Sequence, residues 1–99
     1  MEKGGTVYIM ASLNNIALYT GVTTDLIARI QEHKNGVYPN GFTARYNCVK
    51  LVYYNSFPTI DEAIFEEKRI KAGSRKKKEI LISSMNPQWN DLWEEIKNW

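Results

Sequence analysis

The sequence contains a single cysteine, Cys48, so no disulfide can form within the chain. Disulfides persist in oxidising compartments, and a lone thiol therefore favours a reducing cytoplasm. The sequence also lacks any Cys-x-x-Cys pair or Cys/His spacing typical of a zinc site. Cys48 is interpreted as a small packing residue.

Long hydrophobic runs are also missing. No stretch approaches the roughly 20 apolar residues that a membrane-spanning helix needs, and residues 1–5 lack the apolar segment of a signal peptide. We expect a cytoplasmic protein with no membrane partner. Because internal repeats, linkers and low-complexity segments are absent too, the 99 residues are predicted to form one domain, 1–99.

The chain has little net charge, +2, and that balance alone predicts no partner. The distribution of charge is more informative, because seven basic residues fall within eleven positions: Lys68, Arg69, Lys71, Arg75, Lys76, Lys77 and Lys78. Such a run is usually a solvated helix face. It can also be a surface that contacts nucleic-acid phosphates, and charge alone leaves both interpretations open.

Alternating apolar residues bounded by turn formers predict three strands, over 6–12, 17–23 and 49–56. The first two are expected to form a hairpin, because Asn14 and Asn15 between them tolerate turn conformations. Cross-strand neighbours lie about 5 Å apart. The hairpin should therefore bring Tyr8 and Tyr19 close together.

Helical periodicity predicts four helices. The first begins at a cap, Thr23 or Thr24, and ends at Lys34, and the next two cover 60–71 and 74–84. The fourth is short and contains Trp89, Leu92, Trp93 and Ile96. On the first of these helices, Arg29 and His33 are four residues apart and lie on one edge of its apolar stripe. His33 is interpreted either as a base or proton relay or as a structural histidine with satisfied hydrogen bonds.

The helix over 60–71 carries a carboxylate on its apolar face. Glu67 falls in the middle of this face, whereas Glu66 is expected to point well away from it. A buried carboxylate is costly unless it is paired, protonated or bound to metal. Glu67 is therefore either in a core salt bridge, with Arg29 or a lysine, or a metal ligand.

These residues occur in an ordered pattern: Val7-Tyr8-Ile9, Leu18-Tyr19-Thr20-Gly21, Arg29, His33, Thr43, Glu67 and Asn86-Pro87. The pattern, over roughly residues 5–92, resembles the GIY-YIG nuclease superfamily in its small stand-alone form. It is similar to the N-terminal nuclease module of the bacterial excision-repair excinuclease. The chain departs from the family in two places, since Thr6-Val7 replaces Gly-Ile and Ala72-Gly73 replaces a frequent Gly-Trp.

The resemblance implies an α+β fold, with a small three-stranded antiparallel sheet flanked by helices. It also implies a metal-dependent DNA endonuclease that hydrolyses phosphodiester bonds. In this interpretation Glu67 binds Mg²⁺, for which Mn²⁺ can substitute, and Arg29 holds a phosphate oxygen. Tyr8 or Tyr19 activates the attacking water with help from His33. With one convincing metal carboxylate, a one-metal site is expected.

The resemblance also shifts the basic run toward DNA contact, and the expected DNA-binding residues are Arg45, Lys71, Arg75, Lys76 and Lys77. The sequence contains no recognition helix or zinc finger that would read bases. Cleavage directed by DNA structure, in repair or recombination, is therefore expected, with specificity from DNA shape or a protein partner. Two alternatives stay open, a non-catalytic nucleic-acid-binding adaptor that keeps the fold and a plain interaction domain. Asn86 either supports the site or forms the turn before Pro87.

Overall fold

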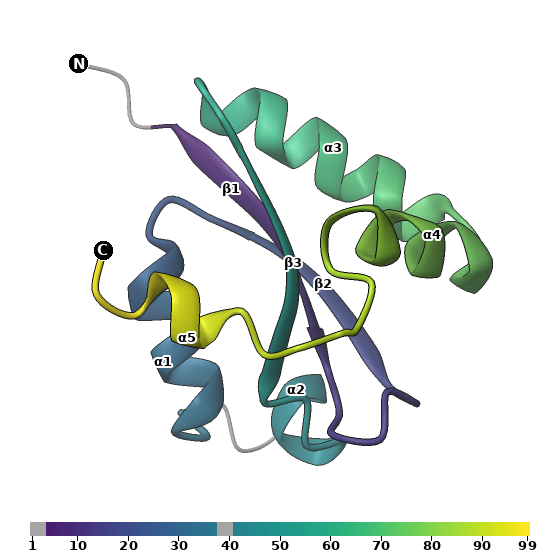
Figure 1. The fold of residues 1–99 in the computed structure, drawn as a ribbon. Helices are drawn as coiled ribbons and strands as arrows, with labels where there is room; N and C mark the ends of the chain where they lie inside the picture. The colour runs from purple at the N-terminus through teal and green to yellow at the C-terminus, as the bar shows by residue number, and fades with distance from the viewer. Residues whose placement is uncertain (1–3, 38–40) are drawn as a thin grey trace.

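The computed structural model describes residues 4–37 and 41–99. Its centre is a three-stranded antiparallel sheet in the order β2-β1-β3, with helices on both faces (Figure 1). The strands are β1 (Gly5–Ala11), β2 (Leu18–Thr23) and β3 (Lys50–Phe57), each within about one residue of the predicted range. The predicted α+β fold is confirmed.

The predicted hairpin joins β1 to β2. Ser12 and Asn15 close it through a hydrogen bond from Asn15 N to Ser12 O of 2.9 Å. Asn15 takes a left-handed conformation with φ of 62°, which asparagine tolerates better than most residues. Tyr8 pairs with Gly21, and Met10 pairs with Tyr19. The two tyrosines are therefore diagonal neighbours, and their ring centroids lie 6.2 Å apart.

The alternation of side chains along β1 separates two hydrophobic clusters. Val7, Ile9 and Ala11 belong to a cluster covered by α3 (Ile60–Ala72) and α4 (Arg75–Met85). Tyr8 and Met10 belong to the opposite cluster, covered by α1 (Leu26–Lys34) and α5 (Trp93–Ile96). Figure 1 shows these two helical layers on either side of the sheet. A short helix, α2 (Phe42–Arg45), precedes β3.

Side-chain caps explain where the long helices begin. Thr59 and Ser74 accept hydrogen bonds from the backbone of α3 and α4. The cap of α1 is Asp25 and not Thr23 or Thr24, because Asp25 Oδ1 accepts from Ala28 N at 3.1 Å. Thr23 Oγ1 instead accepts from Asp25 N at 3.0 Å. None of the described helices is long and apolar enough to cross a membrane.

The predicted helix over 89–96 is wrong in extent, since only Trp93–Ile96 is helical. Trp89 has φ of 54°, which a right-handed helix cannot contain. It packs against the α3 and α4 side of the sheet, whereas Leu92 and Ile96 belong to the α1 side. The chain therefore crosses from one face of the sheet to the other beside β3 (Figure 1).

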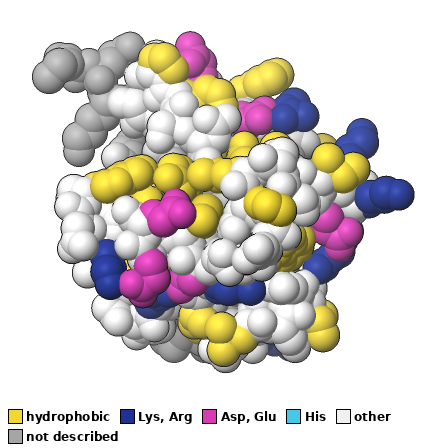
Figure 2. All heavy atoms as spheres, viewed as in Figure 1, with side chains coloured by type: hydrophobic (Ala, Val, Ile, Leu, Met, Phe, Trp, Pro, Cys, Tyr) yellow, Lys and Arg dark blue, Asp and Glu magenta, His cyan; other side chains and the backbone are white. Residues whose placement is uncertain are grey.

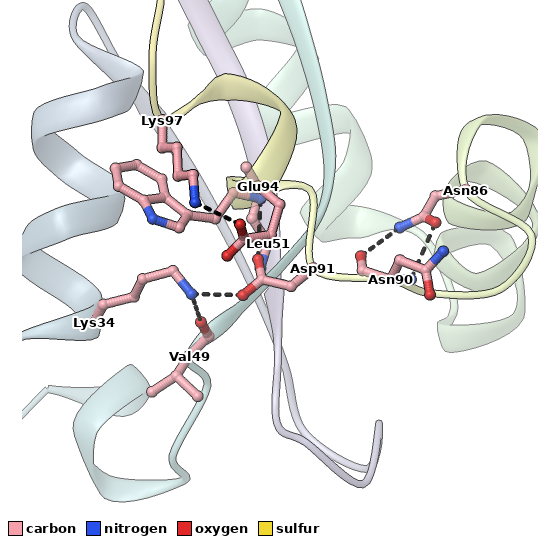
Figure 3. Close-up of polar contacts among 9 residues, drawn as sticks. Lys34, Val49, Leu51, Asn86, Asn90, Asp91, Glu94 and Lys97 are labelled. Atoms are coloured by element: carbon pink, nitrogen blue, oxygen red, sulfur yellow. Dashed lines mark hydrogen bonds and ion pairs between the residues drawn. The ribbon is translucent and has the colours of Figure 1, made fainter.

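Asp91 fastens this crossing segment, as Figure 3 shows. Its Oδ1 accepts from Leu51 N of β3 at 3.0 Å, and its Oδ2 lies 2.6 Å from Lys34 Nζ at the end of α1. The same ammonium donates to Val49 O at 2.8 Å, and Leu92 N donates to Leu51 O at 2.7 Å. The segment thus ties α1 to the outer edge of β3.

Candidate active site

A buried chain of hydrogen bonds connects three elements on the α1 side of the sheet. Tyr8 Oη from β1 lies 2.8 Å from His33 Nε2 of α1, and His33 Nδ1 lies 2.9 Å from Thr43 Oγ1 of α2. All three residues are buried. The predicted site residues Tyr8 and His33, 25 positions apart in the sequence, are thus in direct contact.

The surroundings keep both rings neutral near pH 7. Burial raises the pKa of Tyr8 well above its ordinary value, and Tyr19 adds to the rise while Arg29 opposes it. Burial lowers the pKa of His33 below 6.5, and the Arg29 guanidinium lowers it further, against an opposing effect of Glu32. Tyr8 is therefore a proton donor at neutral pH, and His33 is an uncharged base.

The Tyr8 ring lies directly over Gly21 of β2. A Cβ atom added at Gly21 would be 2.5 Å from Tyr8 Cζ and from Tyr8 Oη. Any larger residue would push the ring away from its position against His33. Glycine at this position is therefore a requirement of the close approach between the tyrosine and the neighbouring strand.

Gly21→Ala is expected to destabilise the fold by about 1–3 kcal/mol, because the fully buried Tyr8 ring has no room to move. Urea unfolding measures this loss. Gly73→Ala is the milder comparison, since the backbone φ of Gly73 is −78° and an added Cβ would lie 3.3 Å from Ile70 O, a tight contact but a longer one than the 2.5 Å at Gly21. If Gly21→Ala were as stable as Gly73→Ala, the close packing of Tyr8 on β2 would be contradicted.

Tyr19 and Arg29 flank the Tyr8–His33 pair. The Tyr19 ring centroid lies 5.5 Å from that of His33, and Tyr19 is only partly buried, whereas Tyr8 is fully buried. Arg29 Nε lies 3.3 Å from Glu32 Oε1, and about a third of the Arg29 side chain is exposed. The structure thus gathers four predicted site residues from β1, β2 and α1, and the more solvent-accessible two are Tyr19 and Arg29.

Glu67 lies on α3, in the other helical layer. Its side chain is only 13% exposed, and its Oε1 lies 3.2 Å from Lys71 Nζ. The lysine partner considered as an alternative is therefore present. That ammonium is half exposed, so solvent screens the pair and its contribution to stability is small.

The expectation that Glu66 points well away from the apolar face is wrong. Its side chain is 17% exposed and pairs with Arg69 at 2.5 Å, which lowers the Glu66 pKa. The inward face of α3 is centred on Ala63 and Ile70, which are buried. Successive residues are about 100° apart around a helix, so positions 66 and 67 fall on either side of this centre.

Strand β2 lies between the two parts of the candidate site. It is an edge strand of the sheet, and α3 packs against it. A shallow surface hollow of about 250 Å³ runs past this edge and is lined by Leu18, Tyr19, Thr20, Phe42, Lys71 and Lys78. It connects Tyr19, beside His33, with Lys71, the partner of Glu67. Among residues 4–37 and 41–99, no three His, Cys, Asp or Glu side chains form a ready metal-binding cluster.

The basic residues of α4 differ in their contacts. Arg75 donates to the carbonyls of Asn15 and Ile16 in the hairpin turn and pairs with Glu79 at 3.0 Å. Lys76 and Lys77 are exposed, and Lys77 lines a groove of about 450 Å³ between α3 and α4, together with Arg69 and Lys78. Figure 2 shows Lys and Arg side chains gathered at the right edge of the molecule, over these helices. Arg75 thus supports the hairpin and Lys78 donates to Gly73 O at 2.7 Å, whereas Lys76 and Lys77 face solvent.

Asn86 is a structural residue. It is buried, and its amide Nδ2 donates to Val52 O at 3.2 Å and to Asn90 O at 2.8 Å. Its Oδ1 accepts from Asn90 N at 3.1 Å, so the side chain holds the turn after α4 closed (Figure 3). The interpretation of Asn86 as a turn former agrees with these contacts.

Sequence reasoning missed the contribution of Thr43 to the site. Thr43 is part of the family pattern, but no periodicity places it beside a histidine ten residues earlier. Its contact with His33 joins α2 to α1 and has no local signal in the sequence. Tyr38, Pro39 and Asn40, between α1 and α2 in the sequence, lie outside the described residues.

Residues 4–79 match the family described as the GIY-YIG catalytic domain. The chain therefore belongs to the GIY-YIG family, a family of nuclease domains, and the resemblance seen in the sequence is confirmed. This class agrees with the three-stranded antiparallel sheet and its flanking helices.

The similar proteins are small members of this family. A UPF0213 protein of Bacillus pumilus (strain SAFR-032) is 34% identical over 97 residues, 98% of each chain. UPF0213 protein SSP2268 of Staphylococcus saprophyticus is 43% identical over 67 residues, 68% of this chain and 80% of that one. The solution NMR structure of UPF0213 protein BH0048 from Bacillus halodurans has a TM-score of 0.57 and 33% identity, and covers 89% of this chain and 92% of that chain.

Proposed function

We propose that this GIY-YIG domain is a metal-dependent DNA endonuclease that hydrolyses phosphodiester bonds at sites chosen by DNA structure, in repair or recombination. The observation that supports it most is the contact between Tyr8 and His33, with Arg29 and Tyr19 beside it. A neutral histidine next to a tyrosine and a guanidinium is a suitable group for removing a proton beside an anionic phosphate.

Burial and hydrogen bonding support one path for the proton. Tyr19 is the tyrosine that solvent reaches, so it contacts the attacking water. Tyr8 lies behind it and passes a proton to His33 Nε2, while Thr43 accepts from His33 Nδ1 and sets this tautomer. Because each hydroxyl gives up one proton as it takes another, no free tyrosinate is needed. The raised pKa of Tyr8 is therefore compatible with its role.

Arg29 and Glu67 act on the phosphate. The Arg29 guanidinium holds a non-bridging oxygen and stabilises the charge that develops in the transition state. Glu67 fits Mg²⁺ or Mn²⁺, because Mg²⁺ is commonly held by one or two carboxylates together with waters and substrate phosphates. When bound there, the ion supplies electrostatic stabilisation to the phosphate and the leaving oxygen.

The direct test is a nicking assay on labelled flap, branched, nicked and single-stranded DNA, with Mg²⁺, with Mn²⁺ and with a chelator. Cleavage that needs the metal and differs among the structures supports the proposal. Binding without cleavage on every substrate would favour the non-catalytic adaptor. An equal cleavage rate on all the DNA structures would indicate that a protein partner, and not DNA structure, supplies the specificity.

We expect the exposed lysines of α4 to bind the DNA backbone. The double variant Lys76→Gln, Lys77→Gln should weaken binding to all sequences alike. The slope of log affinity against log salt should shrink by about 0.9 for each duplex phosphate that the variant no longer neutralises. Cleavage at saturating DNA should change little. Fluorescence anisotropy across a salt series measures the slope.

The control for the lysine variants is Lys97→Gln, because Lys97 lies beyond α5 and pairs with Glu94. Arg75→Gln should instead lower stability, since Arg75 holds the hairpin turn. An unchanged salt slope in the double variant would mean that the basic run is a solvated helix face, and the expected DNA path would move toward Arg45 and Lys50.

A further inference from the structure

Aromatic rings form a continuous line from the buried tyrosine to the surface. Beyond Tyr8 and Tyr19, the Phe42 ring stacks on Tyr19 with centroids 6.1 Å apart and planes 29° apart. Tyr46 follows, with its centroid 4.6 Å from that of Phe42. These separations are typical of interacting aromatic rings. The line therefore leads from the candidate active site to solvent.

The outer end of this line is exposed to solvent. Phe42 is 43% exposed and Tyr46 is 47% exposed, although large aromatic side chains are mostly buried in folded proteins. The Arg45 guanidinium lies over the Tyr46 ring, 5.5 Å from its centroid. We name Phe42, Arg45 and Tyr46 the aromatic platform. Thr43, on the same short helix, is buried and contacts His33.

The platform adjoins a basic surface. Phe42 lines the hollow along the edge of β2 together with Tyr19, Lys71 and Lys78. An anionic chain placed along this hollow would have its phosphates near the two lysines and its bases near the rings. Stacked aromatic rings beside a positively charged groove are characteristic of proteins that bind single-stranded nucleic acid.

We infer that the aromatic platform stacks an unpaired nucleobase of the DNA next to the phosphate held at the Tyr8–Arg29–His33 site. This inference rests on the proposed nuclease function and adds the substrate class, DNA with unpaired nucleotides beside the cleaved bond. Bases inside a duplex are already stacked on both faces, so only an unpaired base offers a free face to Phe42 or Tyr46. Because every base has such a face, recognition is independent of sequence.

Exposed aromatic residues and arginine also occur in protein–protein interfaces. The nucleic-acid occupant is favoured because the platform is continuous with Tyr19 and with the basic hollow. A protein segment would not need either neighbour. The charge and the position of the platform thus point to the DNA itself.

The test measures binding in the presence of a chelator, so that its result does not depend on cleavage. The probe is a short DNA with one 2-aminopurine, whose fluorescence falls when the base stacks, as a single strand and as a duplex, with single-stranded RNA of the same sequence as a third arm. The wild-type protein is expected to quench the single-stranded DNA. Phe42→Leu and Tyr46→Leu should each weaken that binding by about 5- to 150-fold and remove the quenching, with little effect on duplex affinity.

Phe65→Leu is the matched control, because Phe65 is 73% exposed on α3 but lies among Asp61, Glu62 and Glu66. It should leave binding unchanged, and Phe42→Trp should keep both affinity and quenching. Equal losses on single-stranded and duplex DNA, or no loss, would overturn the inference, and tighter binding to RNA would overturn its assignment to DNA.

The outcomes separate this inference from the proposed function. If the protein quenches the probe in a way that depends on Phe42 but cleaves no DNA, the role of the aromatic platform is supported and the proposed nuclease function is contradicted. If Phe42→Leu and Tyr46→Leu cleave DNA as fast as the wild type and bind it as tightly, the role of the aromatic platform is contradicted and the proposed nuclease function is supported. A fall in turnover with unchanged affinity and quenching would make Phe42 a packing support of Tyr19 and would also overturn the inference.

Discussion

Replacing Glu67 with glutamine is expected to lower metal-dependent cleavage by at least about 100-fold, because a bound metal ion contributes several kcal/mol of transition-state stabilisation. The fold should be kept. Glutamine has nearly the same shape, and the ion pair with the half-exposed Lys71 contributes little to stability. A nicking assay measures the activity, and calorimetric titration with Mg²⁺ and Mn²⁺ measures metal binding.

The neighbouring residue provides the control. Glu66 lies on the same helix, is nearly as buried as Glu67 and also pairs with a basic side chain, Arg69. Glu66→Gln should therefore reproduce the general cost of removing a carboxylate from this face of α3 without loss of cleavage. Undiminished cleavage by Glu67→Gln, or an equal loss in both variants, would end the assignment of Glu67 as the metal ligand.

Arg29→Ala is expected to lower turnover by about 10²–10³-fold and to weaken DNA binding much less, because its interaction with the phosphate strengthens as charge develops in the transition state. Arg29→Lys should restore little of the rate, since an ammonium cannot reproduce a two-pronged guanidinium contact. Single-turnover rates at saturating DNA, together with binding measured without metal, separate the two effects. An affinity loss that explains the whole fall in activity would make Arg29 a binding residue.

The pH dependence of the same variants adds a second readout. In the wild type the His33 pKa is below 6.5, partly because of Arg29, so His33 remains a base to lower pH than an unperturbed histidine. Removing the guanidinium allows the His33 pKa to rise. The acidic limb of the rate profile should therefore move to higher pH in Arg29→Ala. In Arg29→Lys the positive charge remains, and the limb should stay near its wild-type position while the rate stays low.

The sequence predicted the elements whose signals are local. The hairpin has two asparagines at its turn, α3 and α4 have capping side chains, and β1 alternates strictly between two faces. Each of these features is decided by residues within a few positions of one another. The four site residues on the α1 side follow from the hairpin and from the spacing of Arg29 and His33.

The features that sequence reasoning missed depend on distant packing. Trp89 and Leu92 have the spacing of one helical face. The same spacing occurs in the observed irregular segment, in which Trp89 packs on one face of the sheet and Leu92 on the other. Glu66 and Glu67 are distinguished by family resemblance and not by burial, because the centre of the inward face falls between them. His33 contacts Thr43 of α2, ten residues later in the chain, and no local sequence signal predicts this contact.

The Asp91 contacts have a consequence for synthesis of the protein. Domains generally fold as units, and Asp91 is made after all three strands and after α1 to α4. Until then, Lys34 lacks its carboxylate partner, and the outer edge of β3 lacks the contacts of Asp91 and Leu92. The contacts that anchor the helix carrying Arg29 and His33 to the edge of β3 therefore become available only when residue 91 has been made.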